Sequence, residues 1–242
     1  MKTNTYDCLV IGAGHAGIEA ALAASRMGLA TAVVTLSAQT IGEMSCNPAV
    51  GGVGKGQLVR EIDALGGEMG LAADAAAIQF RQLNASKGPA VRSSRTQADR
   101  DLYRKHMQGA MARQTNLTLV EDMVETLIVK NKRVRGVVTA SGLRIKTATL
   151  ILAAGTFLNG RMHIGKKIIP GGRVHEPASV RLTESLKDLG FDIVYFKTGT
   201  PPRLDGRTID FTKMEIQHSD KRPIPFSLRT PPLAKNRRLL PC

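Results

Sequence analysis

The sequence predicts an α/β fold of the doubly wound, Rossmann-like type, in which an antiparallel meander replaces one crossover helix. A strand, a helix and a second strand follow one another between residues 8 and 36. Three short segments of alternating polarity lie between residues 124 and 146, and an apolar run at 149–155 ends in small residues. Alternating strands and helices indicate a parallel sheet, and closely spaced strands joined by turns indicate antiparallel pairing.

The strand–helix–strand unit opens the chain. Cys8–Ile11 is a short apolar run that suits a strand buried on both faces. Helical spacing follows and ends at Gly28, where a C-cap is expected. Residues 31–35 are rich in β-branched side chains and predict the second strand.

A G-x-G-x-x-G motif joins the first strand to the helix, and it predicts a dinucleotide site. Its residues are Gly12, Ala13, Gly14, His15, Ala16 and Gly17. The first glycine permits a tight turn, the second lets the backbone approach a pyrophosphate on the helix N-terminus, and the third allows close packing. The alternative is a tight turn without a ligand. The acid expected after the second strand is missing, and Thr35 or Ser37 stands near its place.

The middle of the chain predicts loops and helices. Residues 44–56 form a glycine-rich loop that fails the P-loop pattern, since Ala49 and Gly56 replace required residues. A helix is expected from Leu58, and residues 84–92 predict a polar loop whose basic groups could contact phosphate. Another helix is expected at 98–112. The expected apolar contacts are Leu58, Ile62, Leu65 and Met69 in the first helix and Ala98, Leu102, Met107 and Ala110 in the second.

Cys46 is the candidate catalytic residue, because it lies in a polar, glycine-rich loop. A nearby Lys55 or a helix N-terminus would stabilise a reactive thiolate. The alternative is a buried, inert thiol, which is the interpretation favoured for Cys8. The third cysteine, Cys242, is distant in sequence, so the spacing supports neither a disulfide framework, a dithiol centre nor a metal site.

Composition narrows the class of protein. With 43% apolar and 22% charged residues the chain is neither disordered nor fibrous. Its 34 Lys and Arg against 20 Asp and Glu give a net charge of +14, which suits either a polyanionic partner or a basic protein without one. No apolar run is long enough to cross a bilayer, and no secretory signal opens the chain, so we expect a cytoplasmic protein with no membrane partner.

The meander decides which dinucleotide is expected. Residues 124–130, 134–139 and 143–146 predict three strands with turns at Asn131-Lys132 and Ser141-Gly142, followed by a buried strand at 149–155. An NAD-only domain more often uses a helix for this crossover. The pattern therefore predicts the FAD-binding, glutathione-reductase-type version of the fold.

Five ordered blocks resemble the MnmG (GidA) family of FAD-dependent enzymes that modify the wobble uridine of tRNA. The blocks are residues 12–17, 44–56, 85–92, 155–160 and 197–203. The resemblance implies FAD binding through residues 12–17, the backbone of Val124 and Ser179. It also implies that Cys46 is one of two cysteines linked to activity, and that an acid after the second strand is not required.

The resemblance further implies a reaction and partners. The family adds an aminomethyl or carboxymethylaminomethyl group to carbon 5 of the wobble uridine, with methylene-tetrahydrofolate as one-carbon donor and NADH as reductant. It acts with the GTPase MnmE in a heterotetramer and forms homodimers. Two alternatives remain from the residues: a flavin oxidoreductase acting on a small molecule, or a dinucleotide- or tRNA-binding module without activity.

The resemblance also divides the chain. We expect an FAD-binding domain over residues 1–197 and the truncated beginning of an inserted NADH-binding domain over residues 198–242. Because family members continue well beyond this length, we expect the chain to be the front part of a longer enzyme. The segment after Lys197 would then lack most of its partners and be poorly ordered.

Overall fold

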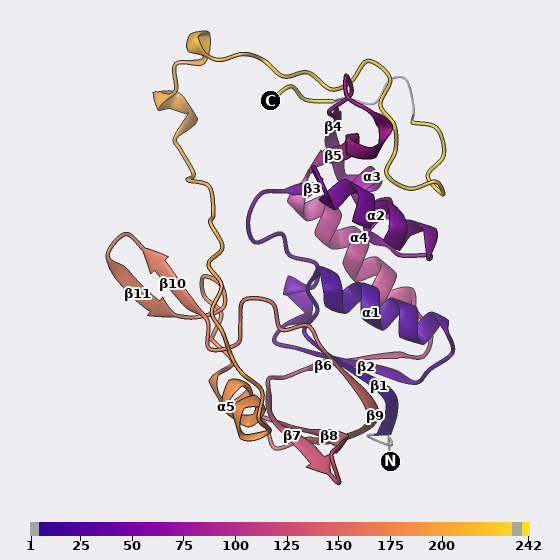
Figure 1. The fold of residues 1–242 in the computed structure, drawn as a ribbon, viewed down its shortest axis with the longest axis vertical. Coiled ribbons are helices and arrows are strands. Elements are labelled where there is room, and N and C mark those ends of the chain that lie inside the picture. The colour runs from indigo at the N-terminus through magenta and orange to yellow at the C-terminus, as the bar shows by residue number, and fades with distance from the viewer. Residues whose placement is uncertain (1–4, 234–238) are drawn as a thin grey trace. The chain divides into compact units, whose positions relative to one another are not determined.

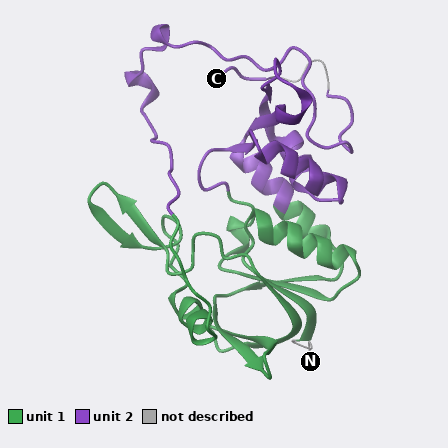
Figure 2. Cartoon of the chain, in the orientation of Figure 1, with its two compact units in different colours: residues 1–43, 108–196 green, residues 44–107, 197–242 purple. Residues whose placement is uncertain are grey.

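The computed structural model describes residues 5–233 and 239–242 and confirms the α/β fold. The chain forms two compact units (Figure 2). Unit 1 comprises Met1–Glu43 and Gln108–Phe196, and unit 2 comprises Met44–Met107 and Lys197–Cys242. The expected domain boundary between residues 197 and 198 stays a prediction.

Unit 1 is built on a six-stranded mixed sheet of order β6-β2-β1-β9-β8-β7 (Figure 1). Its strands are β1 (Thr5–Ile11), β2 (Thr31–Thr35), β6 (Leu117–Glu121), β7 (Val124–Lys130), β8 (Arg133–Thr139) and β9 (Arg144–Leu152). Strand β1 pairs in parallel with β2 and β9, and β2 pairs in parallel with β6. Strands β7, β8 and β9 pair antiparallel, so the predicted meander crossover is confirmed.

Strand β9 corrects one detail of the prediction. We expected separate strands at 143–146 and 149–155, whereas a single strand runs over Arg144–Leu152. No glycine or proline interrupts it, and Thr147 and Thr149 favour an extended backbone. Its first residues pair with β8 and its later ones with β1, so one strand joins the meander to the parallel sheet.

Helices cover the sheet of unit 1. Helix α1 (His15–Arg26) packs on β1 and β2, and α5 (Val180–Asp188) packs on β7. A hairpin of β10 (Arg161–Ile164) and β11 (Lys167–Pro170) precedes α5, and the sequence interpretation missed it. The core between sheet, meander and α5 consists of Leu9, Ile11, Ala32, Val34, Val124, Val137, Ile145 and Leu182.

Unit 2 contains a three-stranded antiparallel sheet of order β3-β5-β4. Its elements are β3 (Ala49–Gly51), α2 (Lys55–Ala64), α3 (Met69–Ala76), β4 (Ala77–Leu83) and β5 (Ser93–Ala98). Helix α4 (Arg100–Arg113) begins in unit 2, and its last six residues belong to unit 1. Short 3-10 turns occupy Ala38–Thr40, Pro89–Val91, Gly206–Thr208 and Phe211–Lys213.

The expected helix from Leu58 is in fact two helices with a different buried face. Helix α2 ends before Gly66, whose φ of 89° suits glycine, and α3 then begins at Met69. Leu58 and Leu65 are 56% and 90% exposed, so the predicted apolar face is wrong. The buried residues of α2 are Gly56, Val59 and Asp63. Asp63 can be buried because its carboxylate accepts hydrogen bonds from Ser227 and Leu228, far along the chain.

Helix α4 buries two of the residues expected of it, Met107 and Ala110. Ala98 is also buried, but it ends β5 rather than beginning the helix, and Leu102 is 51% exposed. Tyr103, which was not predicted as a contact, is completely buried. The strands β4 and β5 were not predicted, because their sequences are rich in polar residues and lack the regular alternation of apolar and polar side chains that marks a strand.

Two buried carboxylates of unit 2 bind the described residues 226–228, which belong to the segment after Lys197. Asp74 accepts hydrogen bonds from the backbone N–H groups of Phe226 (2.7 Å) and Ser227 (2.9 Å). Asp63 accepts from the Ser227 hydroxyl (2.6 Å) and the Leu228 N–H (3.0 Å). Burial alone would raise the pKa of Asp63, but these bonds and one from Arg229 outweigh it and hold the pKa below its usual value.

Replacing the Asp74 carboxylate tests this anchor. Asp74→Ala leaves two buried N–H groups without their acceptor, and each costs about 1–3 kcal/mol, so the free energy of unfolding should fall by about 2–6 kcal/mol. Urea unfolding measures the change. The control is Asp188→Ala at the exposed end of α5, which should stay within about 0.5 kcal/mol of the wild type. Equal stability of the two variants would contradict the anchoring role.

Candidate functional site

The glycine loop of residues 12–17 has the geometry that its motif predicts. Gly12 adopts φ +98°, and a Cβ there would meet the Ala153 carbonyl oxygen. A Cβ on Gly17 would overlap the Gly12 carbonyl oxygen, so only glycine allows this close turn. Gly14 has no atom within 4 Å of the place where a Cβ would stand. The loop is therefore closed on its inner side and open at Gly14.

The N-terminus of α1 is an anion-binding position. Its N-cap is Gly14, which offers no side chain to the first N–H groups of the helix, and its first turn carries no acidic residue. The N–H groups of His15, Ala16 and Gly17 therefore lie where a pyrophosphate can accept their hydrogen bonds, with the positive end of the helix dipole behind them. The open side at Gly14 and the uncapped helix fit the dinucleotide that the sequence predicts.

The carboxyl ends of the parallel strands meet at this loop. Gly12 N–H donates to Val34 O (2.8 Å) at the end of β2, and Ala153 N–H donates to Ile11 O (2.9 Å) at the end of β1. Ligands of doubly wound sheets bind at this edge. Val124 lies in the same core cluster as Ile11 and Val34, so the structure brings this predicted residue to the same part of unit 1.

Ser179 is held by backbone hydrogen bonds to the segment that follows β9. Its N–H donates to Phe157 O (2.8 Å), and its own carbonyl accepts from Asn159 N–H (3.2 Å), which holds it beside the segment that follows β9. It stands at the N-cap of α5 without making a side-chain cap bond. Ser179 therefore keeps a hydroxyl and a helix N-terminus for a polar ligand group.

Arg173 is a charged neighbour of the loop that the sequence interpretation missed. Burial, and secondarily the charge of Arg173, lowers the pKa of His15 below its ordinary value. The Arg173 side chain pairs with Glu176 and lies 5.7 Å from the ring centre of Phe157. Since this arginine stands 158 residues after His15 in the chain, only the fold reveals that the two interact.

Glu121 supplies an acid where β2 lacks one. It ends β6, opposite Thr35 in the register of β2 and β6. Its carboxylate accepts a hydrogen bond from Ala38 N–H (2.8 Å), just beyond Ser37. Sequence spacing could not identify it, because the motif places the ribose acid on β2 itself. Glu121 therefore places a carboxylate beside the end of β2.

Cys46 lies in unit 2 at the entry to β3, and it is half-buried. Its sulfur lies 3.6 Å from Gly199 O, to which it donates. Its carbonyl oxygen accepts from Arg203 (2.9 Å) and from Arg100 at the start of α4. Two of the blocks noted in the sequence, residues 44–56 and 197–203, thus meet at this cysteine.

The basic neighbours of Cys46 differ from the expectation. Lys55 is exposed at the start of α2, and the described residues show no hydrogen bond or ion pair between it and Cys46. Arg100 and Arg203 are the basic side chains that contact Cys46, and they bind its backbone carbonyl oxygen rather than its sulfur. Cys8 is 3% exposed in β1, as its interpretation as an inert thiol requires. Cys242 is exposed and exchanges backbone hydrogen bonds with Gln217.

Comparison with known proteins decides the family. A profile described as "Glucose inhibited division protein A" (GIDA) matches residues 7–242, nearly the whole chain. The chain belongs to the GidA family. The tRNA uridine 5-carboxymethylaminomethyl modification enzyme MnmG of Geobacter sulfurreducens is 54% identical over 237 residues, which cover 98% of this chain and 38% of that protein. The chain thus spans well under half the length of this relative.

Solved structures agree with the assignment to the GidA family. GidA of Aquifex aeolicus superposes with a TM-score of 0.94 at 50% identity, covering 98% of this chain and 40% of that one. A GidA-related protein from Thermus thermophilus shares the fold at 21% identity, with a TM-score of 0.55 over 78% of this chain and 70% of that one. No helix in residues 5–233 and 239–242 is both long and apolar enough to span a membrane.

The lowered pKa of His15 gives a pH test. The unfolded chain gains this proton as the pH falls through 6.5, whereas folded His15 gains it only at lower pH. The free energy of unfolding should therefore fall between those two pKa values on acidification, and His15→Gln should reduce the fall. Denaturant unfolding at pH 7.5 and 5.5 measures it. His163→Gln, on exposed β10, is the control, and an equal fall in all three proteins would contradict the assignment.

Proposed function

We propose that the protein is an FAD-dependent enzyme that adds an aminomethyl or carboxymethylaminomethyl group to carbon 5 of the wobble uridine of tRNA. The observation that carries the proposal is the open, uncapped glycine loop at α1 in a chain of the GidA family. The printed name of the Geobacter relative, a tRNA uridine modification enzyme, supports the substrate. The net charge of +14 suits a polyanionic substrate.

FAD would be held by the residues of unit 1. The N–H groups at the start of α1 would bind the pyrophosphate, and Gly14 would allow its close approach. Glu121 would accept from ribose hydroxyls, and Val124 and Ser179 would contact the cofactor through backbone and hydroxyl groups. When bound, the flavin supplies redox chemistry and carries the one-carbon unit. A neutral His15 would leave the positive charge at the loop to the helix dipole and Arg173.

Cys46 would activate the uracil ring. Its thiolate would add to carbon 6, and the electron pair of the carbon 5–carbon 6 double bond would move to carbon 5, which makes carbon 5 a nucleophile for an incoming one-carbon electrophile. Loss of the carbon 5 proton then restores the double bond and expels the thiolate. Arg100 and Arg203, which bind the Cys46 carbonyl oxygen, hold this segment in place and make its surroundings positive.

The finer points of the proposal follow the family resemblance. Methylene-tetrahydrofolate would supply the carbon, and NADH would reduce the flavin. The complete protein would act in the cytoplasm as a homodimer that joins the GTPase MnmE in a heterotetramer. The name of the MnmG relatives supports modification of tRNA uridine. The co-substrates and the partner protein are proposed from the family resemblance.

A substitution at Gly14 tests cofactor binding without disturbing the fold. A Cβ on Gly14 has open space in the protein but stands where the pyrophosphate approaches, so Gly14→Ala should fold normally and bind FAD about tenfold more weakly or worse. Flavin absorbance and a titration of FAD into the apoprotein measure this. Gly206→Ala, also in open space and outside the loop, is the control and should bind FAD as the wild type does. Unchanged affinity in Gly14→Ala would contradict the pyrophosphate site.

Cys46→Ser tests the chemistry in the complete protein. The variant should retain FAD, because Cys46 is not among the proposed FAD contacts, and should lose wobble-uridine modification to roughly 1% of wild type or less. Cys8→Ser is unsuitable as a control because it is buried in β1, so Cys242→Ser, at an exposed site, is the matched variant. Mass spectrometry of the tRNA nucleosides gives the result. Normal modification by Cys46→Ser would remove the residue from the mechanism. Flavin reduction without any tRNA binding would instead favour an oxidoreductase of small molecules.

A further inference from the structure

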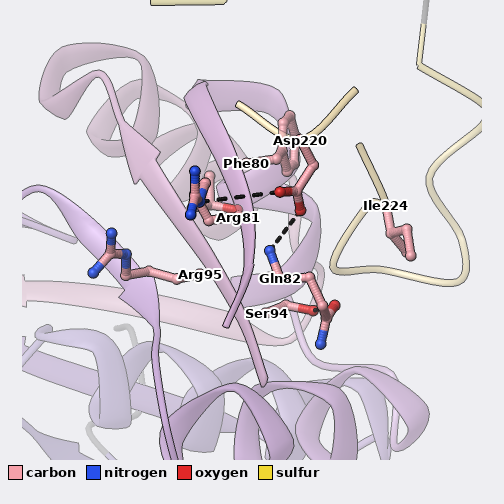
Figure 3. Close-up of a pocket in the computed structure, with 8 residues that line it drawn as sticks. Phe80, Arg81, Gln82, Ser94, Arg95, Asp220 and Ile224 are labelled. Atoms are coloured by element: carbon pink, nitrogen blue, oxygen red, sulfur yellow. Dashed lines mark hydrogen bonds and ion pairs between the residues drawn. The ribbon is translucent and has the colours of Figure 1, made fainter. Parts of the chain in front are cut away.

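Two arginines face each other across neighbouring strands of unit 2. Arg81 on β4 pairs directly with Arg95 on β5 in the antiparallel register. Directly opposed like charges destabilise a sheet, so such a pair needs a compensating group. Both residues line a recess together with residues 80, 82, 94, 96, 220 and 224 (Figure 3).

In the described part of the chain Arg81 has one carboxylate near it, and Arg95 has none. The Nε atoms of Arg81 and Arg95 are buried, and neither has a hydrogen-bond partner in residues 5–233 and 239–242. Asp220 is the one carboxylate in the lining, and its Oδ1 lies 4.0 Å from Arg81 Nε, beyond hydrogen-bond distance. Its Oδ2 already accepts from the Gln82 N–H (2.6 Å).

Other buried polar atoms of the same sheet also lack a hydrogen-bond partner in the described residues. The Thr96 hydroxyl is completely buried and unpartnered within the described part of the chain. Arg95 makes no side-chain hydrogen bond or ion pair there, whereas Arg81 donates to His218 O (2.9 Å) and forms a long ion pair with Asp220 (4.0 Å). Buried cations are normally paired, and a guanidinium matches the oxygens of an oxyanion in a bidentate way. The missing partner is therefore an acceptor of hydrogen bonds with negative charge.

We propose that Arg81 and Arg95 bind a backbone phosphate of the RNA substrate, an inference that rests on the proposed function. The loop joining their strands is exposed and carries Lys87 and Arg92, which extends the positive surface beyond a single small anion. Strand β5 ends at Ala98, and Arg100 at the start of α4 binds the Cys46 carbonyl oxygen. Five extended residues at roughly 3.3 Å each span up to about 17 Å, and the arginine pair would hold a nucleotide other than the one that reacts at Cys46.

Salt dependence of tRNA binding by the complete protein tests this site. A protein loses about 0.7 from the slope of log K against log salt for each phosphate contact to single-stranded RNA that is removed. Arg95→Gln should therefore reduce the slope by about 0.7 and weaken binding about fivefold at 0.1 M KCl. Fluorescence anisotropy with labelled tRNA between 50 and 200 mM KCl measures both.

Two variants control for folding and for charge alone. Arg95→Lys keeps the cation and should retain the wild-type slope. Arg207→Gln removes an exposed arginine that pairs with Asp205 and should leave the slope unchanged. A thermal melt should show that Arg95→Gln is as stable as the wild type or more stable, because it relieves the opposed charges.

The outcomes separate this inference from the proposed function. If the wild type binds no tRNA at any salt concentration, the proposed function fails. If the wild type binds and Arg95→Gln keeps its affinity and slope, the phosphate site is overturned while the function stands. A lower melting temperature with unchanged tRNA binding would show that the arginine neutralises an acid of the protein itself, and this also overturns the site.

Discussion

The close approach of Gly17 to the Gly12 carbonyl oxygen is the constraint on which unit 1 depends. It brings the start of α1 against the end of β1, and a side chain at either position would separate them. The same turn leaves the first N–H groups of α1 without a capping side chain and open at Gly14. A stable packing arrangement and an anion-binding position thus result from one backbone geometry, and the parallel strands end beside it.

Unit 2 is held together by buried charged groups as well as by apolar side chains. Buried Asp63 and Asp74 bind the turn at 226–230 by hydrogen bonds. Phe226 in this turn is completely buried. The segments around Cys46 and Gly199 meet in the same unit, with Arg100 and Arg203 on the cysteine carbonyl oxygen. Such networks fix positions through directional bonds, which suits a region proposed to handle charged substrates.

Local patterns predicted unit 1 well and unit 2 poorly, for physical reasons. The glycine motif, the β-branched second strand and the turns at Asn131 and Gly142 each depend on nearby residues, and the structure has them as expected. Strands β4 and β5 carry arginines, glutamines and serines that only a sheet with polar partners would bury. Asp63 replaces the expected leucines on the inner face of α2, because its partners lie about 165 residues later. Arg173 and Glu121 escaped notice for the same reason.

The central claim is that the α1 loop binds the pyrophosphate of FAD in an enzyme that works with a thiol at Cys46. A crystal structure of the complete protein with its bound cofactor, identified by mass spectrometry, tests it most directly. We expect FAD, with its pyrophosphate on the N–H groups of His15, Ala16 and Gly17. A different cofactor or a pyrophosphate bound elsewhere would contradict the account.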